Sequence, residues 1–155
     1  MAKMSKNQID DIKNSISRYL SMREHSRLEI FEKLIRKDFD QTLIDQCLLE
    51  FSTNNLLSDQ RYTETFIRSK YNNGKGPSFI KASLKLKGID SQTIQTALSK
   101  ISDDDWVQSA TKALKKKTIK KNMSKQEQKQ KQQQFLSQRG FTINIIINAI
   151  NEYWK

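Results

Sequence analysis

A twelve-residue pattern occurs three times along the chain and limits the possible fold more than any other feature of the sequence. The copies are KDFDQTLIDQCL (residues 37–48), KGIDSQTIQTAL (87–98) and RGFTINIIINAI (139–150). Each contains a basic residue, a turn residue, a hydrophobe and Asp or Thr; an isoleucine follows five positions after the hydrophobe, and a small-plus-large apolar pair three positions later. Three matches in the same order predict tandem copies of one supersecondary unit.

The spacing that the three copies share indicates what one unit contains. Its hydrophobic anchors stand 50 and 52 residues apart, and a leucine precedes each anchor by five positions. Gly88 and Gly140 suit the left-handed residue that ends many helices, and Asp90 or Thr142 would cap the helix that follows. Each unit is therefore expected to be helix, helix, tight turn, helix. The anchors are Phe39, Ile89 and Phe141, and the leucines are Leu34, Leu84 and Leu136.

Helical periodicity predicts three helices in the first 50 or so residues. The first 20 residues form one amphipathic helix, and Ser26 with Glu29 forms a capping box that opens the second. The third helix begins near Asp40. The apolar stripes expected on the three helices are Ile9, Ile12, Ile16, Tyr19 and Leu20; Leu28, Phe31, Leu34 and Ile35; and Ile44, Cys47, Leu48 and Phe51.

The last third of the chain predicts the same kind of unit. A helix from about Asp103 has acidic residues at its start and lysines at its end, as the helix dipole favours. Ser124 and Glu127 form a second capping box, which opens a glutamine-rich helix ending near Arg139. The β-branched run 145–147 would suggest a strand by itself, but the repeat assigns it to a helix. The inward residues are Trp106, Val107, Ala110, Ala113 and Leu114, then Ile146, Ala149, Ile150 and Tyr153.

The predicted fold is therefore all-α, with three tandem three-helix repeats resembling helix-turn-helix units in an elongated array. The repeats are expected at residues 8–55, 56–101 and 102–155. The composition agrees, since four glycines and one proline in 155 residues favour helix over sheet.

The net charge of +11 predicts attraction to polyanions or to an acidic protein surface. Between Lys112 and Lys131 the chain has nine lysines and one glutamate, a local excess of +8. This run is either a solvated helix face or a nucleic-acid patch, and the sequence alone leaves both interpretations open.

Residue counts argue against most enzyme chemistry. One histidine, His25, and one cysteine, Cys47, are too few for the usual zinc site. Cys47 falls on an inner helical stripe and is predicted to be a core residue, and His25 is predicted to help start the second helix. The run Asp103 to Asp105 is interpreted as helix capping rather than a metal site. No enzymatic activity, cofactor or metal is expected. Because no apolar stretch reaches the length of a membrane span or a signal peptide, a cytoplasmic protein is expected.

The segment NNGKGPS (residues 72–78) raises the question of a phosphate-binding loop. A P-loop needs Gly, four residues, then Gly-Lys and Ser or Thr after a buried strand, and here Lys75 lies between Gly74 and Gly76 with no strand before it. Pro77 suits the first position of a helix. The segment is interpreted as a flexible hinge followed by a helix start.

Three segments carry a resemblance to a known family. They are SMREHSRLEIFEKL (residues 21–34), LLSDQRYTETFIRSKYNNGKGPSFIKASLKLKGI (56–89) and QKQKQQQFLSQRGF (128–141). Together with the repeats they resemble the RecX family, bacterial regulators of the RecA recombinase, over about residues 17–153. The departures are Leu57-Ser58-Asp59 where the family has Leu-Asp-Asp, and the glutamine-rich third unit.

The resemblance implies a non-catalytic protein that binds RecA filaments on DNA within their helical groove. It would inhibit filament growth, ATP hydrolysis and strand exchange, acting as a monomer on RecA and on single- or double-stranded DNA, directly or through the filament, and not at a membrane. The alternative is a basic DNA-binding protein acting mainly through phosphate contacts. The residues expected to contact the partner or DNA are Arg23, Arg27, Arg61, Arg68, Lys75, Lys81, Lys85 and Arg139.

Overall fold

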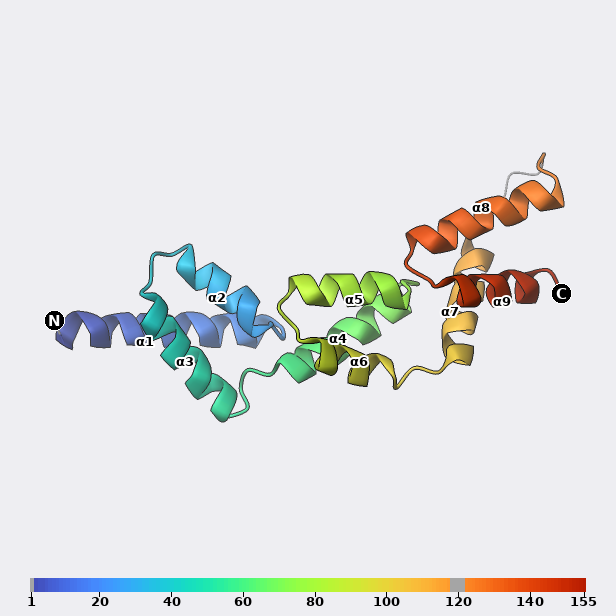
Figure 1. Ribbon diagram of the computed structural model, residues 1–155. Coiled ribbons are helices and arrows are strands. Elements are labelled where there is room, and N and C mark those ends of the chain that lie inside the picture. The colour runs from blue at the N-terminus through green and yellow to red at the C-terminus, as the bar shows by residue number, and fades with distance from the viewer. Residues whose placement is uncertain (1, 118–121) are drawn as a thin grey trace. The chain divides into compact units, whose positions relative to one another are not determined.

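The computed structural model of the chain describes residues 2–117 and 122–155, with side chains from residue 6 onward. Within these ranges the secondary structure is entirely helical (Figure 1). Two lysines of the basic run, Lys120 and Lys121, lie outside the described residues. The described helices are α1 Ala2–Met22, α2 Arg27–Ile35, α3 Gln41–Thr53, α4 Asp59–Asn72, α5 Pro77–Leu86, α6 Ser91–Leu98, α7 Asp103–Lys116, α8 Lys125–Gln138 and α9 Ile143–Tyr153.

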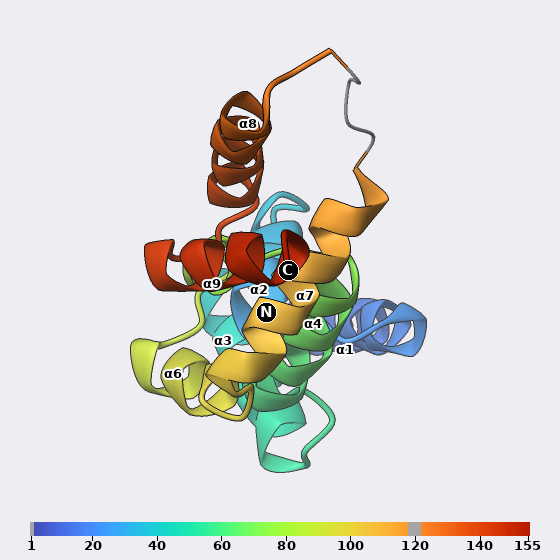
Figure 2. The same ribbon diagram turned by 90° about the vertical axis from the view of Figure 1, so that its right-hand side faces the viewer.

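The chain divides into two compact units. Unit 1 comprises Met1–Thr65 with Lys85–Asp90, and unit 2 comprises Phe66–Leu84 with Ser91–Lys155. In unit 1, α3 packs on both α1 and α2, around a core that includes Ile12, Ile30 and Leu48. In unit 2, α9 crosses and packs against α7 and also contacts α8 (Figures 1 and 2).

Three kinds of position in the repeated pattern are buried in every copy. The leucines Leu34, Leu84 and Leu136 are all 0% exposed. The isoleucines Ile44, Ile94 and Ile146 are at most 3% exposed, and the small residues of the apolar pairs are also buried. Residues that match in the sequence repeat therefore also match in how they pack. The predicted all-α repeat fold is confirmed.

The tight turn has the predicted left-handed residue in each repeat. Gly88 and Gly140 have φ angles of 79° and 93°, and Asp38 takes the same conformation at 63° in the first copy. Aspartate tolerates this region better than most residues because its short side chain bonds locally. The hydrophobe after the turn donates its N–H to the preceding leucine, from Phe39 to the Leu34 oxygen at 3.4 Å and from Phe141 to the Leu136 oxygen at 3.1 Å.

Some local predictions need correction. On α2, Ile30 rather than Ile35 is in the core, since Ile35 is 38% exposed. Thr142 occupies the N-cap of α9 but makes no side-chain capping bond. Ser124 accepts the N–H of Glu127 at 3.2 Å, which is one half of the predicted capping box. On α9, Ile145 is buried beside Ile146, so the inward face is broader than the repeat indicated.

Candidate functional site

Three of the eight predicted contact residues are unpaired cations on the surface. Arg68 on α4 and Lys81 and Lys85 on α5 are exposed, and none has a hydrogen bond or ion pair within the part of the chain that the structure describes. Lys75 lies over the ring of Phe79, with 4.8 Å from Nζ to the ring centroid. These side chains keep most of their charge available to a partner.

Arg27 and Arg61 are engaged within unit 1. Arg61 donates from Nε to Glu24 at 2.9 Å, and from its other nitrogens to the Asn55 side chain and the Leu56 carbonyl. Arg27 donates to Asp45 at 2.9 Å, and its backbone N–H donates to Asp59 at 2.8 Å. Arg61 in particular bridges the ends of α1, α3 and α4, which gives it a structural role that helical periodicity cannot reveal.

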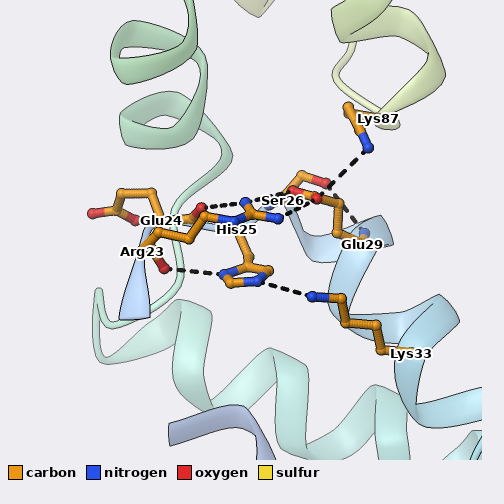
Figure 3. Close-up of polar contacts among 7 residues, drawn as sticks. All are labelled: Arg23, Glu24, His25, Ser26, Glu29, Lys33 and Lys87. Carbon is orange, nitrogen blue, oxygen red and sulfur yellow. Dashed lines mark hydrogen bonds and ion pairs between the residues drawn. The ribbon is translucent and has the colours of Figure 1, made fainter. Parts of the chain in front are cut away.

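Arg23 belongs to a polar cluster around the buried carboxylate of Glu29 (Figure 3). Arg23 Nη2 donates to Glu29 Oε2 at 2.9 Å, and Lys87 Nζ lies 3.7 Å from the same oxygen. The predicted capping box is complete, because Ser26 and Glu29 exchange side-chain and backbone bonds at 3.1 Å. Burial would raise the pKa of Glu29, but the bonds from Arg23 and the Ser26 N–H and the charge of Lys87 outweigh it and lower the pKa to about 2.

His25 lies in the same cluster and is 2% exposed. Its Nδ1 is 3.0 Å from the Arg23 carbonyl oxygen, and its Nε2 is 3.1 Å from Lys33 Nζ (Figure 3). Because a carbonyl only accepts and an ammonium only donates, the ring must be neutral with its proton on Nδ1. Burial lowers the pKa of His25, and the charges of Arg23 and Lys33 act in the same direction. His25, which was predicted to help start α2, is therefore a buried, neutral residue that joins the Arg23 backbone to the Lys33 side chain.

The turn of the second repeat packs against the start of α2 within unit 1. A Cβ added to Gly88 would lie 2.7 Å from Leu28 Cβ, so the backbone of the turn touches the first turn of α2. Beside it, Lys87 reaches Glu29. We call this arrangement of residues 87–89 on the start of α2 the first turn contact.

The turn of the third repeat packs in the same way against the start of α5 within unit 2. The N–H groups of Gly76 and Ser78 donate to the carbonyls of Arg139 and Gly140 at 2.8 and 2.9 Å. A Cβ on Gly76 would lie 2.4 Å from the Gly140 carbon, and one on Gly140 would lie 2.4 Å from Phe79 Cβ. We call this arrangement of residues 139–141 on 74–79 the second turn contact. The predicted helix start is confirmed, because α5 begins at Pro77, and Gly76 allows the close approach of the two backbones.

Arg139 completes the second turn contact. Its Nη1 donates to the carbonyls of Asn73 and Gly74 at 3.1 and 3.4 Å, and the guanidinium lies 4.7 Å from the Phe135 ring centroid. It therefore caps the end of α4 and is only partly available to a partner. The sequence signal for both turn contacts was the basic residue that opens each copy of the pattern, here Lys87 and Arg139.

No group of three or more His, Cys, Asp or Glu suited to a metal occurs among the described residues. Cys47 is 2% exposed, as predicted, and burial raises the pKa of its thiol, which disfavours the reactive thiolate. In the described ranges, no helix combines the length and apolar character that crossing a membrane requires.

Comparison with known proteins identifies the family. Sequence models of the first, second and third three-helix domains of RecX match residues 13–50, 58–98 and 103–150. The chain belongs to the RecX family. Regulatory protein RecX of Legionella pneumophila is 36% identical over 139 residues, which covers 90% of this chain and 92% of that protein. Regulatory protein RecX of Acinetobacter baylyi is 36% identical over 132 residues, covering 85% of this chain and 81% of that protein.

Solved structures agree with this assignment. The crystal structure of RecX from Lactobacillus salivarius superimposes with a TM-score of 0.87 at 28% identity, covering 96% of this chain and 97% of that one. A second RecX crystal structure, at 24% identity and a TM-score of 0.85, shares the fold. The chain is thus a member of a family of regulatory proteins with an all-helical repeat fold. The repeat limits 8–55, 56–101 and 102–155 stay a prediction.

Proposed function

We propose that this protein is a non-catalytic negative regulator of a RecA recombinase. It binds RecA filaments on DNA in their helical groove and inhibits filament growth, ATP hydrolysis and strand exchange, and so modulates recombination and DNA repair in the cytoplasm. The observation that carries the proposal is the match of three RecX domains along one chain, together with the similarity to relatives named as regulatory proteins.

Repetition suits the recognition of a helical polymer. Successive repeats can contact successive protomers, and several weak contacts sum because each raises the effective concentration of the next. The cations that we assign to this role are the unpaired Arg68 on α4 and Lys81 and Lys85 on α5, with Lys75 near them in sequence. The engaged arginines Arg23, Arg27, Arg61 and Arg139 contribute mainly by holding the helices that present these cations.

Charge reversal on α5 tests the proposal. In the variant Lys81→Glu/Lys85→Glu, about tenfold more protein should be needed for half-inhibition of RecA ATPase activity on single-stranded DNA, because attractive contacts become repulsive. The matched control is Lys6→Glu/Arg18→Glu, which makes the same charge change at exposed positions of α1 and should shift inhibition less than twofold. If the wild-type protein leaves the ATPase unchanged, the proposed function fails. If both double variants inhibit equally, the assignment of the α5 lysines as contact residues is wrong.

The second candidate is a basic protein that acts mainly by binding DNA phosphates. The exposed lysines Lys112, Lys115 and Lys116 on α7, none of which has an ion pair among the described residues, favour it. Binding of this kind weakens steeply with salt and does not depend on DNA sequence. Inhibition of RecA at protein concentrations that leave bare DNA unbound would exclude this candidate.

A further inference from the structure

A cavity of about 540 Å³ within unit 2 has a lining that is rich in positive charge. It lies between the end of α4 and the outer face of α7, and Arg139 of the second turn contact forms part of its wall. The lining includes the cations Lys112, Lys116 and Arg139, the side chains of Asn72, Asn73 and Gln108, and no carboxylate. All of these residues belong to the described part of the chain.

The two lysines of the cavity are free to meet a ligand. Lys112 and Lys116 stand four residues apart on α7, which places them one above the other on the same helical face. Both are exposed, and neither forms an ion pair within the described ranges. Their charges are therefore not neutralised by the protein itself.

Arg139 adds a directed set of donors. A guanidinium has five N–H donors, and the bonds to the Asn73 and Gly74 carbonyls both come from Nη1. Within the described ranges the donors on Nε and Nη2 form no hydrogen bond, and we assign them to a ligand. Because the group is held by those carbonyls and by the Phe135 ring, its orientation is set before a ligand arrives.

The other side of α7 provides a contrast. A hollow of about 520 Å³ there is lined by Lys112 and Lys115, but also by Asp104 and Glu152. Two carboxylates balance two lysines, so that hollow has no preference for an anion. Of the two, only the cavity on the Lys116 side of α7 has an excess of positive charge that would favour an anion.

We propose that the cavity lined by Lys112, Lys116 and Arg139 binds a backbone phosphate of a nucleic-acid strand. Arginine with lysine is the usual recognition set for phosphate, and amide side chains such as those of Asn72 and Gln108 add hydrogen bonds to the sugar-phosphate backbone. At about 30 Å³ per water, the volume far exceeds what one phosphate displaces, so there is room for the flanking sugars of a strand. The inference rests on the proposed function, which places the protein beside DNA. It locates a strand contact within unit 2, between the end of α4 and α7.

Two adjacent lysines of α7 offer a matched test. The full chain and its variants Lys116→Glu and Lys115→Glu are titrated into a fluorescently labelled twelve-residue oligothymidine, and anisotropy is followed from 50 to 200 mM salt. The two variants carry the same charge change in the same helical turn, but only Lys116 lines the proposed site. Lys116→Glu should weaken binding about tenfold and reduce the salt slope by about 0.7, one phosphate contact, whereas Lys115→Glu should change binding less than twofold.

The double variant Lys112→Gln/Lys116→Gln removes the charges without reversal and keeps the test valid if a glutamate disturbs α7. Equal losses for Lys115→Glu and Lys116→Glu, or no loss for either, would overturn the site. The ligand class is tested by competition: oligothymidine should displace the probe, whereas inorganic phosphate, thymidine monophosphate and poly-glutamate at equal charge should not. Equal displacement by any of these three would overturn the assignment to a strand.

The same variants separate this inference from the proposed function. RecA ATPase inhibition is measured alongside oligothymidine binding. Loss of inhibition only in Lys81→Glu/Lys85→Glu, together with loss of strand binding only in Lys116→Glu, supports both proposals. Wild-type protein that binds the strand through Lys116 but never inhibits RecA contradicts the proposed function and leaves the phosphate site standing.

Discussion

The two turn contacts have the same place in the repeat but different chemistry. The first, in unit 1, joins the backbone at Gly88 to the side chain of Leu28 and adds the charge pair of Lys87 with Glu29. The second, in unit 2, brings two backbones together through two N–H donors and leaves no space for a Cβ at Gly76 or Gly140. One contact depends on charge and on a side chain, and the other on close approach of main chains.

This difference shows how one repeat pattern tolerates different sequences. A flexible side chain or a charged pair can adjust to its neighbours, whereas a backbone-to-backbone contact accepts only glycine. The first turn contact should therefore respond to pH, and the second should respond mainly to changes of volume.

The largest expected effect is at Gly140. Gly140→Ala adds the cost of a left-handed residue to a collision with the backbone of Phe79, whose nitrogen is 2.5 Å from the new Cβ, and should lower the free energy of unfolding by about 3–5 kcal/mol. Gly88→Ala meets Leu28, whose Cδ2 can rotate away but whose Cβ, at 2.7 Å, moves only with the start of α2, and should cost about 2–3 kcal/mol. Urea unfolding followed by circular dichroism measures both.

Gly74→Ala is the control for this series. It has the same φ of 79° as Gly88, but its nearest neighbours are the end of the Arg139 side chain at 3.2 Å and Ala113 Cβ at 3.7 Å. It should therefore cost only the conformational penalty of about 1–2 kcal/mol. Equal costs at all three glycines would mean that backbone conformation alone matters and that the two contacts do not differ in space.

The next largest effect on stability is expected from removing the charge of Glu29 at the first turn contact. Glu29→Gln keeps a residue that can complete a capping box but leaves Arg23 and Lys87 without their carboxylate, so unfolding should be easier by about 1–3 kcal/mol at pH 7. Because the pKa of Glu29 is lowered from 4.5 to about 2, its contribution is complete above pH 4.5 and is lost as the pH falls toward 2. The variant should lose this part of the acid dependence.

Urea unfolding of the wild type and Glu29→Gln at pH 7, 4 and 2.5 checks that expectation, with Glu127→Gln as a control at the exposed glutamate of the equivalent position on α8. The difference between wild type and Glu29→Gln should shrink at pH 2.5. A constant difference across the three values would show that the carboxylate charge is unimportant there.

The smallest effect is expected at His25. Its pKa should lie below the ordinary 6.5, because the ring is buried against Arg23 and Lys33. The unfolded chain then binds the proton first, so stability falls modestly as the pH drops through 6.5. Since His25 is the single histidine of the chain, its ring signals in a proton NMR titration report this pKa directly. A value above 6.5 would contradict the neutral ring and its bond from Lys33.

The sequence was most informative where structure is local. The apolar spacing that marked Leu34 and Ile44 reflects the helical period, and the capping box at Ser26 and Glu29 lies within one turn, so both could be predicted without a fold. The same reasoning missed Ile30, because the width of a buried stripe depends on how many helices cover it. It also selected Arg61 as a contact residue, since an exposed arginine and one engaged by Glu24 look alike in sequence.

The sequence by itself determined the helices, the turn conformation at Gly88 and Gly140, and the repeat register, because each follows from interactions between residues a few positions apart. Only the tertiary structure decided which cations are free. Arg61 pairs with Glu24, 37 positions away, and Arg139 bonds to Asn73, 66 positions away. Helical periodicity cannot predict contacts at such separations. The role of Gly76 was likewise decided by a backbone that reaches it from the next repeat, which is a matter of packing rather than of local chain preference.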